Sequence, residues 1–94
     1  MIRRDGDRLV VEGPVTLDTV PELATELEGH LGQGDAVVDF GGVTDVDSSA
    51  VALVLEWRRQ AERRSVSLRL ANTPEALQNL AKLYGVLELL PLAR

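Results

Sequence analysis

The stretch from Asp45 to Gln60 constrains the fold more than any other part of this sequence, because it predicts a helix that is apolar on every side. It opens with short polar residues that suit a helix N-terminus and ends in a basic run that suits a helix C-terminus. Between them, residues 50–55 are all apolar. A helix that only covers a sheet needs one apolar stripe, so this helix is expected to be buried on two sides. The second side needs a packing partner.

Length, charge and cysteine content limit the class of protein. The 94 residues are enough for one small domain, and we expect a single domain over residues 1–94. The absence of cysteine excludes disulfides and thiolate metal sites, which fits the cytoplasm. A net charge of -5 argues against nucleic-acid binding. No apolar run approaches the roughly 18 residues of a membrane span, and the N-terminus lacks the apolar core of a signal peptide.

The first third of the chain predicts a hairpin followed by a helix. Asp5-Gly6 separates two short β-prone runs, which is the strongest local signal for antiparallel strands. Gly13-Pro14 is expected to break the second strand. Thr19, with proline and glutamate among the next three residues, predicts a capping box at the start of a helix that ends before Gly32.

The rest of the chain alternates strands and helices. Residues 36–40 predict a buried strand that Gly41-Gly42 ends, and residues 66–70 predict a half-buried strand. Thr73 is expected to cap a last helix that stops at Gly85, after which an apolar tail packs back on the domain. This order predicts an α/β sandwich with a mixed β-sheet and with helices mostly on one face.

The polar start of the central helix has two possible chemical roles that its sequence disfavours. Side chains between Asp45 and Glu56 fall at calcium-loop ligand positions, but Ala50 replaces the glycine that the sharp turn of such a loop needs. Ser48 and Ser49 lack a general base, because the sole histidine, His30, belongs to another predicted helix. We therefore expect no metal, no cofactor and no enzymatic activity.

The two serines are suited to contact a partner protein or to be phosphorylated. A hydroxyl at an exposed helix N-terminus is accessible to a kinase, and the helix dipole favours a phosphate there. Helix capping is their simpler alternative role. At 100° per residue, Ala50, Leu53 and Trp57 share one face of the helix. Trp57 on that face is expected to anchor a partner protein, and packing at the edge of the core is its alternative.

The basic run at the end of the central helix has a structural interpretation as well. Arg58, Arg59, Arg63 and Arg64 carry most of the positive charge of the second half of the chain. We interpret them as a solvated face that complements the helix dipole, with an acidic partner surface as the alternative.

The order of elements, together with Asp47-Ser48-Ser49-Ala50-Val51 at the start of a helix, resembles the STAS domain of anti-sigma factor antagonists and sulfate transporter tails. In antagonists a partner kinase phosphorylates the serine of this motif. The resemblance implies that the corresponding residue here is Ser49. Ala50 stands where the motif of antagonists has glycine.

A narrower resemblance, carried by residues 51–59 and 80–84, is to MlaB-type proteins. These are small STAS subunits of the ABC transporter that maintains outer-membrane lipid asymmetry in Gram-negative bacteria. The resemblance implies a cytoplasmic subunit, peripheral at the inner membrane, whose helix start contacts the ATPase of an ATPase–permease complex, with Ser48 in the place of the key hydroxyl. The expected partner-binding residues are Asp47, Ser48, Ser49, Ala50, Leu53, Trp57 and Tyr84. The alternative is an anti-sigma factor antagonist that binds a kinase and carries phosphate on Ser48 or Ser49.

Overall fold

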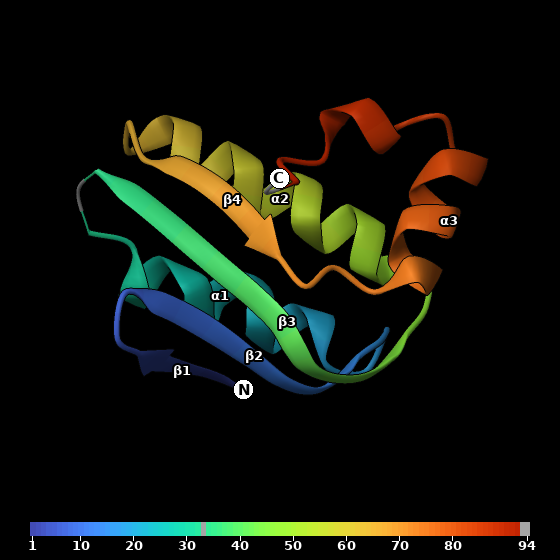
Figure 1. The fold of residues 1–94 in the computed structure, drawn as a ribbon, viewed down its shortest axis with the longest axis horizontal. Helices are drawn as coiled ribbons and strands as arrows, with labels where there is room; N and C mark the ends of the chain where they lie inside the picture. The colour runs from blue at the N-terminus through green and yellow to red at the C-terminus, as the bar shows by residue number, and fades with distance from the viewer. Residues whose placement is uncertain (33, 93–94) are drawn as a thin grey trace.

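The structure is a computed structural model that describes residues 1–32 and 34–92, and these form one four-stranded sheet with helices around it (Figure 1). The elements are β1 (Ile2–Asp5), β2 (Arg8–Val15), α1 (Val20–Glu26), the 3-10 helix η1 (Leu27–His30), β3 (Asp35–Val46), α2 (Ser49–Arg63), β4 (Ser67–Ala71), α3 (Glu75–Leu83) and the 3-10 helix η2 (Leu87–Leu89). The strands lie in the order β1-β2-β3-β4. β1 pairs antiparallel with β2, and β2, β3 and β4 are parallel. The prediction of a mixed α/β sheet is confirmed.

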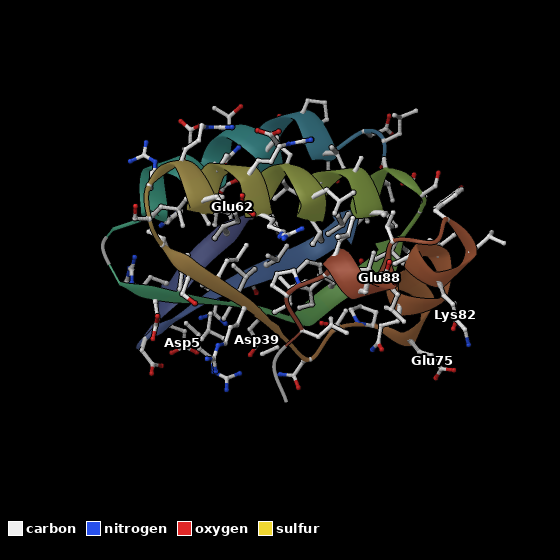
Figure 2. The ribbon with its side chains drawn as sticks, turned by 90° about the horizontal axis from the view of Figure 1, so that it is seen from above. Asp5, Asp39, Glu62, Glu75, Lys82 and Glu88 are labelled. Atoms are coloured by element: carbon white, nitrogen blue, oxygen red, sulfur yellow. The ribbon has the colours of Figure 1, made fainter. Side chains whose placement is uncertain are left out.

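Helices α1 and α2 lie side by side on one face of the sheet, while α3 packs at one end of it (Figures 1 and 2). Both crossovers, β2-α1-β3 and β3-α2-β4, step across the sheet in the same direction. Right-handed crossovers that step in one direction place their helices on the same face. The predicted arrangement of helices mostly on one face follows from this strand order.

The central helix α2 is buried on two sides, as its apolar run predicts. The elements that cover both sides belong to the same domain. Trp57, at 0% exposure, donates a hydrogen bond from Nε1 to the carbonyl oxygen of Leu23 in α1, at 3.0 Å. Its ring meets Phe40 of β3 edge-on, with centroids 6.0 Å apart. The second packing partner of α2 is therefore α1, and the core lies between these helices and the sheet.

Neither Gly41-Gly42 in β3 nor Gly13-Pro14 in β2 ends its strand, so the predicted strand end at Gly41-Gly42 was wrong, and Gly13-Pro14 interrupts the pairing register but not the strand. β3 continues through Gly41-Gly42, and β2 continues through Gly13-Pro14. A Cβ on Gly42 would lie 3.1 Å from the carbonyl oxygen of Val11, so glycine permits the close approach of β2 and β3. The register shifts between the two strands on either side of this contact. The glycines mark irregularities inside long strands rather than strand ends.

The two predicted helix starts agree with the structure only in part. Thr19 is the N-cap residue of α1, as predicted, but it makes no side-chain capping bond. Its hydroxyl is used inside the preceding turn, where it accepts from the N–H of Thr16 at 3.0 Å and donates to the carbonyl of Pro14 at 2.9 Å. The residue before the first residue of α3 is Pro74 rather than Thr73. The Thr19 hydroxyl therefore bonds backbone groups of the preceding turn instead of the first N–H groups of α1.

The face of the sheet opposite the helices is polar and internally paired. Asp39 of β3 accepts hydrogen bonds from Arg8 Nη1 at 3.0 Å, from Asn72 Nδ2 at 2.9 Å and from the N–H of Gly41 at 2.7 Å. Figure 2 shows Asp5 and Asp39 on the side away from α1 and α2. The Asn72 amide, ahead of the Gly41 N–H and Arg8, lowers the pKa of Asp39. The carboxylate is thus ionised at neutral pH and joins three parts of the chain.

Candidate docking site

Three connecting segments meet at the end of the sheet where the parallel strands finish, on the right of Figure 1. They are residues 16–19 after β2, residues 47–48 between β3 and α2, and residues 72–74 between β4 and α3. Parallel strands joined by crossover helices all finish at the same edge of the sheet, so the topology brings these segments together. In open α/β sheets this edge is where ligands bind.

Asp47 joins two of these segments through both oxygens of its carboxylate. Oδ1 accepts from the backbone N–H of Ser49 at 2.9 Å and from the Ser49 hydroxyl. Oδ2 accepts from the backbone N–H of Leu17 at 2.9 Å. A further hydrogen bond runs from the N–H of Asp47 to the carbonyl of Val15, at 3.3 Å. The side chain therefore caps the start of α2 and also fixes the turn that follows β2.

The same contacts set the electrostatics of Asp47. The Ser49 hydroxyl, followed by the Leu17 N–H, lowers the pKa of this carboxyl. The group is therefore ionised at neutral pH. Its negative charge sits beside the N-terminus of α2, where the helix dipole favours an anion.

The two serines differ in their surroundings. Ser48 is exposed at the N-cap position of α2, and its hydroxyl makes no capping bond. Ser49 is half-buried, and its hydroxyl is held by Asp47. Capping of α2 is done by the carboxylate of Asp47, so the expectation that the serines merely cap the helix does not apply to Ser48. Ser48 is the hydroxyl that a partner can reach.

A pocket of about 240 Å³ lies beside this helix start. It is lined by Val43, Thr44, Asp45, Val46, Pro74 and Ala76. On the other side of Asp47, Leu17 is 74% exposed. The sequence analysis did not identify Leu17, because a single leucine after Gly13-Pro14 looks like any other apolar residue of the chain. The only available signal was the neighbouring Asp18-Thr19, which marks a turn.

The predicted docking face formed by Ala50, Leu53 and Trp57 was wrong. Their exposed fractions are 0%, 1% and 0%. They pack against α1 and the sheet within the core, so no partner can contact them while the domain is folded. The periodicity identified an apolar face correctly, but the apolar stripe of α1 covers it.

Tyr84 is accessible but is not part of the cluster around Ser48. It is 54% exposed and follows the last residue of α3. Pro74 and Ala76, which line the pocket, lie at the other end of this nine-residue helix. At 1.5 Å per residue the two ends are about 13 Å apart. The neighbouring Leu83, at 75%, is also exposed.

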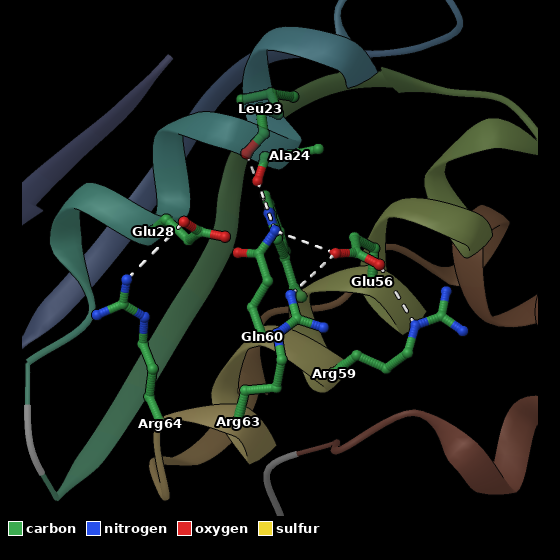
Figure 3. A network of polar contacts seen from close by, with 9 residues as sticks. Leu23, Ala24, Glu28, Glu56, Arg59, Gln60, Arg63 and Arg64 are labelled. Atoms are coloured by element: carbon green, nitrogen blue, oxygen red, sulfur yellow. Dashed lines mark hydrogen bonds and ion pairs between the residues drawn. The ribbon is translucent and has the colours of Figure 1, made fainter.

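The basic run of α2 is neutralised by acids of the same domain (Figure 3). Arg59 and Arg63 pair with Glu56 at 3.3 and 3.4 Å, and Arg64 reaches Glu28 of η1 at 3.8 Å. Arg58 pairs with Glu62 at 3.2 Å. These ion pairs favour the interpretation of a solvated face over that of a basic docking patch.

Nothing around the helix start is arranged for metal binding. Glu56, which would complete a calcium loop, is held by Gln60, Arg59 and Arg63. Among residues 1–32 and 34–92, no group of three or more acidic or histidine side chains is placed to hold a metal ion. Over the same residues, no helix combines the length and the apolar character needed to cross a membrane.

The fold and this site define a class of protein. A mixed sheet with two crossover helices on one face is the fold of a STAS-type domain. A family model described as "Mlab, STAS domain" matches residues 1–91, and the chain belongs to this family.

A solved structure gives the same assignment of fold. The chain is similar to the anti-sigma factor antagonist SpoIIAA in its unphosphorylated form, with a TM-score of 0.71 and 16% sequence identity, over 100% of this chain and 87% of that one. A search of curated protein sequences found no match. STAS domains are in general accessory or regulatory modules that bind other proteins.

Proposed function

We propose that this chain is a non-enzymatic STAS subunit that docks on the ATPase of a phospholipid-transporting ABC complex and supports its assembly or activity. The observation that carries the proposal is the exposed Ser48 hydroxyl at the start of α2, in a domain that belongs to the MlaB-type STAS family. In this proposal the chain lies in the cytoplasm and is held at the inner membrane by the ATPase and its permease.

The geometry favours binding over chemistry at this site. Asp47 accepts two hydrogen bonds from Ser49 at the helix start and a third from the Leu17 N–H, so Ser48 is presented on a rigid element. A rigid, exposed hydroxyl can exchange its water for a partner's hydrogen bond with little loss of conformational entropy. No histidine lies near Ser48 to activate it, because the sole histidine, His30, is in η1.

Substitution of Ser48 by arginine tests this docking site. The long, charged side chain would hold a partner away from the helix start, and we expect the Kd for the ATPase subunit to rise about tenfold or more. Ser67→Arg is the matched control, because Ser67 is an exposed serine at the first residue of β4, at the opposite end of that strand. Binding would be measured by calorimetry with the purified ATPase subunit of the same organism. Equal Kd values for both variants would contradict the proposal.

Regulation by phosphorylation is the second candidate function, as in an anti-sigma factor antagonist. The observation that favours it is again the free, exposed Ser48 hydroxyl, together with the positive end of the α2 dipole. Ser49, the residue that corresponds to the modified serine of antagonists, would have to leave Asp47 first. We therefore place the phosphate on Ser48 in this alternative.

Mass spectrometry after incubation with a cognate kinase and ATP distinguishes the two functions. The alternative requires one added phosphate that disappears in Ser48→Ala and persists in Ser49→Ala. Absence of phosphate from the wild-type chain would exclude the switch but would leave ATPase docking intact. Genes for an ATPase, a permease and a lipid-binding secreted subunit beside the gene for this chain would favour transport, and a gene for an anti-sigma kinase would favour the switch.

A further inference from the structure

Leu17 has an unusual combination of properties for an apolar side chain: it is highly exposed and its backbone is firmly held. Its side chain is 74% exposed. Its N–H donates to Asp47 Oδ2 at 2.9 Å, and the surrounding turn is closed by the Thr19 hydroxyl, which bonds both the Thr16 N–H and the Pro14 carbonyl. Thr19 and Val20 also donate their N–H groups to the Thr16 carbonyl, each at 2.9 Å. The turn is thus fixed on both sides of Leu17.

Such an arrangement suits the anchor of a protein interface. Apolar residues that fill a desolvated pocket carry a large share of the affinity of many complexes. An anchor that is already fixed in its bound position avoids the entropy loss of ordering a loop on binding. Leu17 lies next to the helix start that carries Ser48, because Asp47 bonds both segments.

The charges around Leu17 indicate the chemistry of the partner. Asp18, Asp45 and Glu75 are exposed at this end of the sheet, and Asp47 adds a fourth carboxylate. Residues 15–19, 43–49 and 73–77 contain no lysine or arginine. A complementary partner surface would therefore carry basic side chains around the position where Leu17 inserts.

We propose that Leu17 is the apolar anchor of the docking site, that it inserts into an apolar pocket rimmed by lysine or arginine on the partner protein, and that Asp47 is the positioning residue that presents it. This inference rests on the proposed function, since the partner is the ATPase that docks at the Ser48 end of α2. Asp47 itself need not touch the partner, because it acts through the backbone of Leu17.

The first test compares two leucines of nearly equal exposure. Leu17→Ser is expected to raise the Kd for the purified ATPase subunit about tenfold. Leu83→Ser, at 75% exposure at the far end of α3, is expected to change the Kd less than about twofold. Equal Kd values for the two variants would overturn the proposal. If Ser48→Arg then still weakens binding, ATPase docking stands and only the anchor is wrong; if neither Leu17→Ser nor Ser48→Arg weakens it, both proposals fail.

The second test separates the positioning role of Asp47 from its charge. Asp47→Asn keeps an oxygen that can accept from the Ser49 N–H, but an amide NH₂ cannot accept from the Leu17 N–H. Asp45→Asn removes the same charge from the same end of the sheet. We expect Asp47→Asn to weaken binding about tenfold and Asp45→Asn about threefold or less, because an exposed rim charge contributes little.

Two further measurements test the hydrogen bond between Asp47 and Leu17 and the charge of the partner surface. Hydrogen exchange at the Leu17 amide should accelerate in Asp47→Asn and stay unchanged in Asp45→Asn. Association of the wild-type chain with the ATPase should slow as salt is raised, because the acidic end meets a basic surface. Equal binding by the two asparagine variants would show that Asp47 contributes charge alone. A salt-independent association rate, or formation of a dimer of this chain through Leu17, would refute the basic partner surface.

Discussion

Replacement of Trp57 by alanine decides whether this side chain belongs to the core or to an interface. The apolar pattern of α2 led us to expect a partner anchor at this position, but the structure buries it completely. Its Nε1 is 3.0 Å from the Leu23 carbonyl oxygen, and its ring meets Phe40 at an interplanar angle of 72°. These contacts all lie within the domain, so Trp57→Ala should affect stability rather than binding alone.

The loss of unfolding free energy in Trp57→Ala can be estimated from the buried surface and contacts that the substitution removes. Burial of an aromatic side chain removes about 150–250 Å² from water, which corresponds to about 4–6 kcal/mol at about 25 cal/mol/Å². This is an upper estimate, because an unfolded chain already buries part of that surface. Large-to-small changes of core aromatics cost about 3–5 kcal/mol. We expect a loss of about 4 kcal/mol, against a total of about 5–15 kcal/mol for a domain of ordinary stability.

Urea denaturation followed by far-UV circular dichroism measures this loss, since the variant lacks the sole tryptophan. With an m-value of about 2 kcal/mol/M, the midpoint should fall by about 2 M. Leu83→Ala is the control, because its exposed side chain should matter by less than about 0.5 kcal/mol. If Trp57→Ala fails to fold, Trp57→Phe keeps the ring in the core and should lose about 1–2 kcal/mol with its hydrogen bond. Losses below about 1 kcal/mol in Trp57→Ala would refute the buried position.

Substitutions at three other features of the fold test each of them separately. The pKa of Asp39 lies below its ordinary value of 3.8, so its contribution to stability is present at neutral pH and is lost as pH falls through the lower native pKa. Asp39→Asn should therefore flatten the decline of the unfolding free energy below about pH 4, and Asn72→Ala should reduce the size of that decline, because it brings the native pKa of Asp39 closer to the unfolded value. Gly42→Ala should lower the free energy of unfolding by about 1–3 kcal/mol, measured by urea denaturation, because its Cβ would press on a backbone carbonyl of β2. Gly29→Ala is the control, because Gly29 has open space around it. Thr19→Val should cost about 1–2 kcal/mol and lower the thermal midpoint, because it removes one acceptor and one donor inside the turn; an unchanged midpoint would exclude a structural role for this hydroxyl.

Local signals were enough to predict the order and type of the elements. The hairpin at Asp5-Gly6 and the helix stop at Gly85 depend on backbone conformations that glycine adopts easily, and both glycines have positive φ in the structure. Gly13 inside β2 also has positive φ, whereas Gly42 inside β3 carries the same sequence signal for a different reason, which is the close approach of β2. Sequence alone could not distinguish the two cases, because the distinction depends on which strands become neighbours.

The candidate site was predicted only in part for a similar reason. Asp47, Ser48 and Ser49 were found because a polar helix start is a local signal. The burial of Trp57 depends on α1, which is separated from it by more than thirty residues, as its bond to Leu23 shows. The exposure of Leu17 depends on the Asp47 carboxylate, in the segment between β3 and α2, which holds the Leu17 turn in place. Helical periodicity shows which face is apolar, but it does not show what covers that face.

The ends of the described chain have a consequence for self-association. At one border of the sheet, the N–H of Ile2 donates to Glu26 Oε1 at 2.6 Å. At the other border, the chain after η2 returns along β4, where the N–H of Leu70 donates to the carbonyl of Pro91 at 2.8 Å. A strand border with engaged donors is a poor template for strand addition from a second molecule. The sheet is thus shielded at these positions from growing by strand addition into a chain of identical subunits.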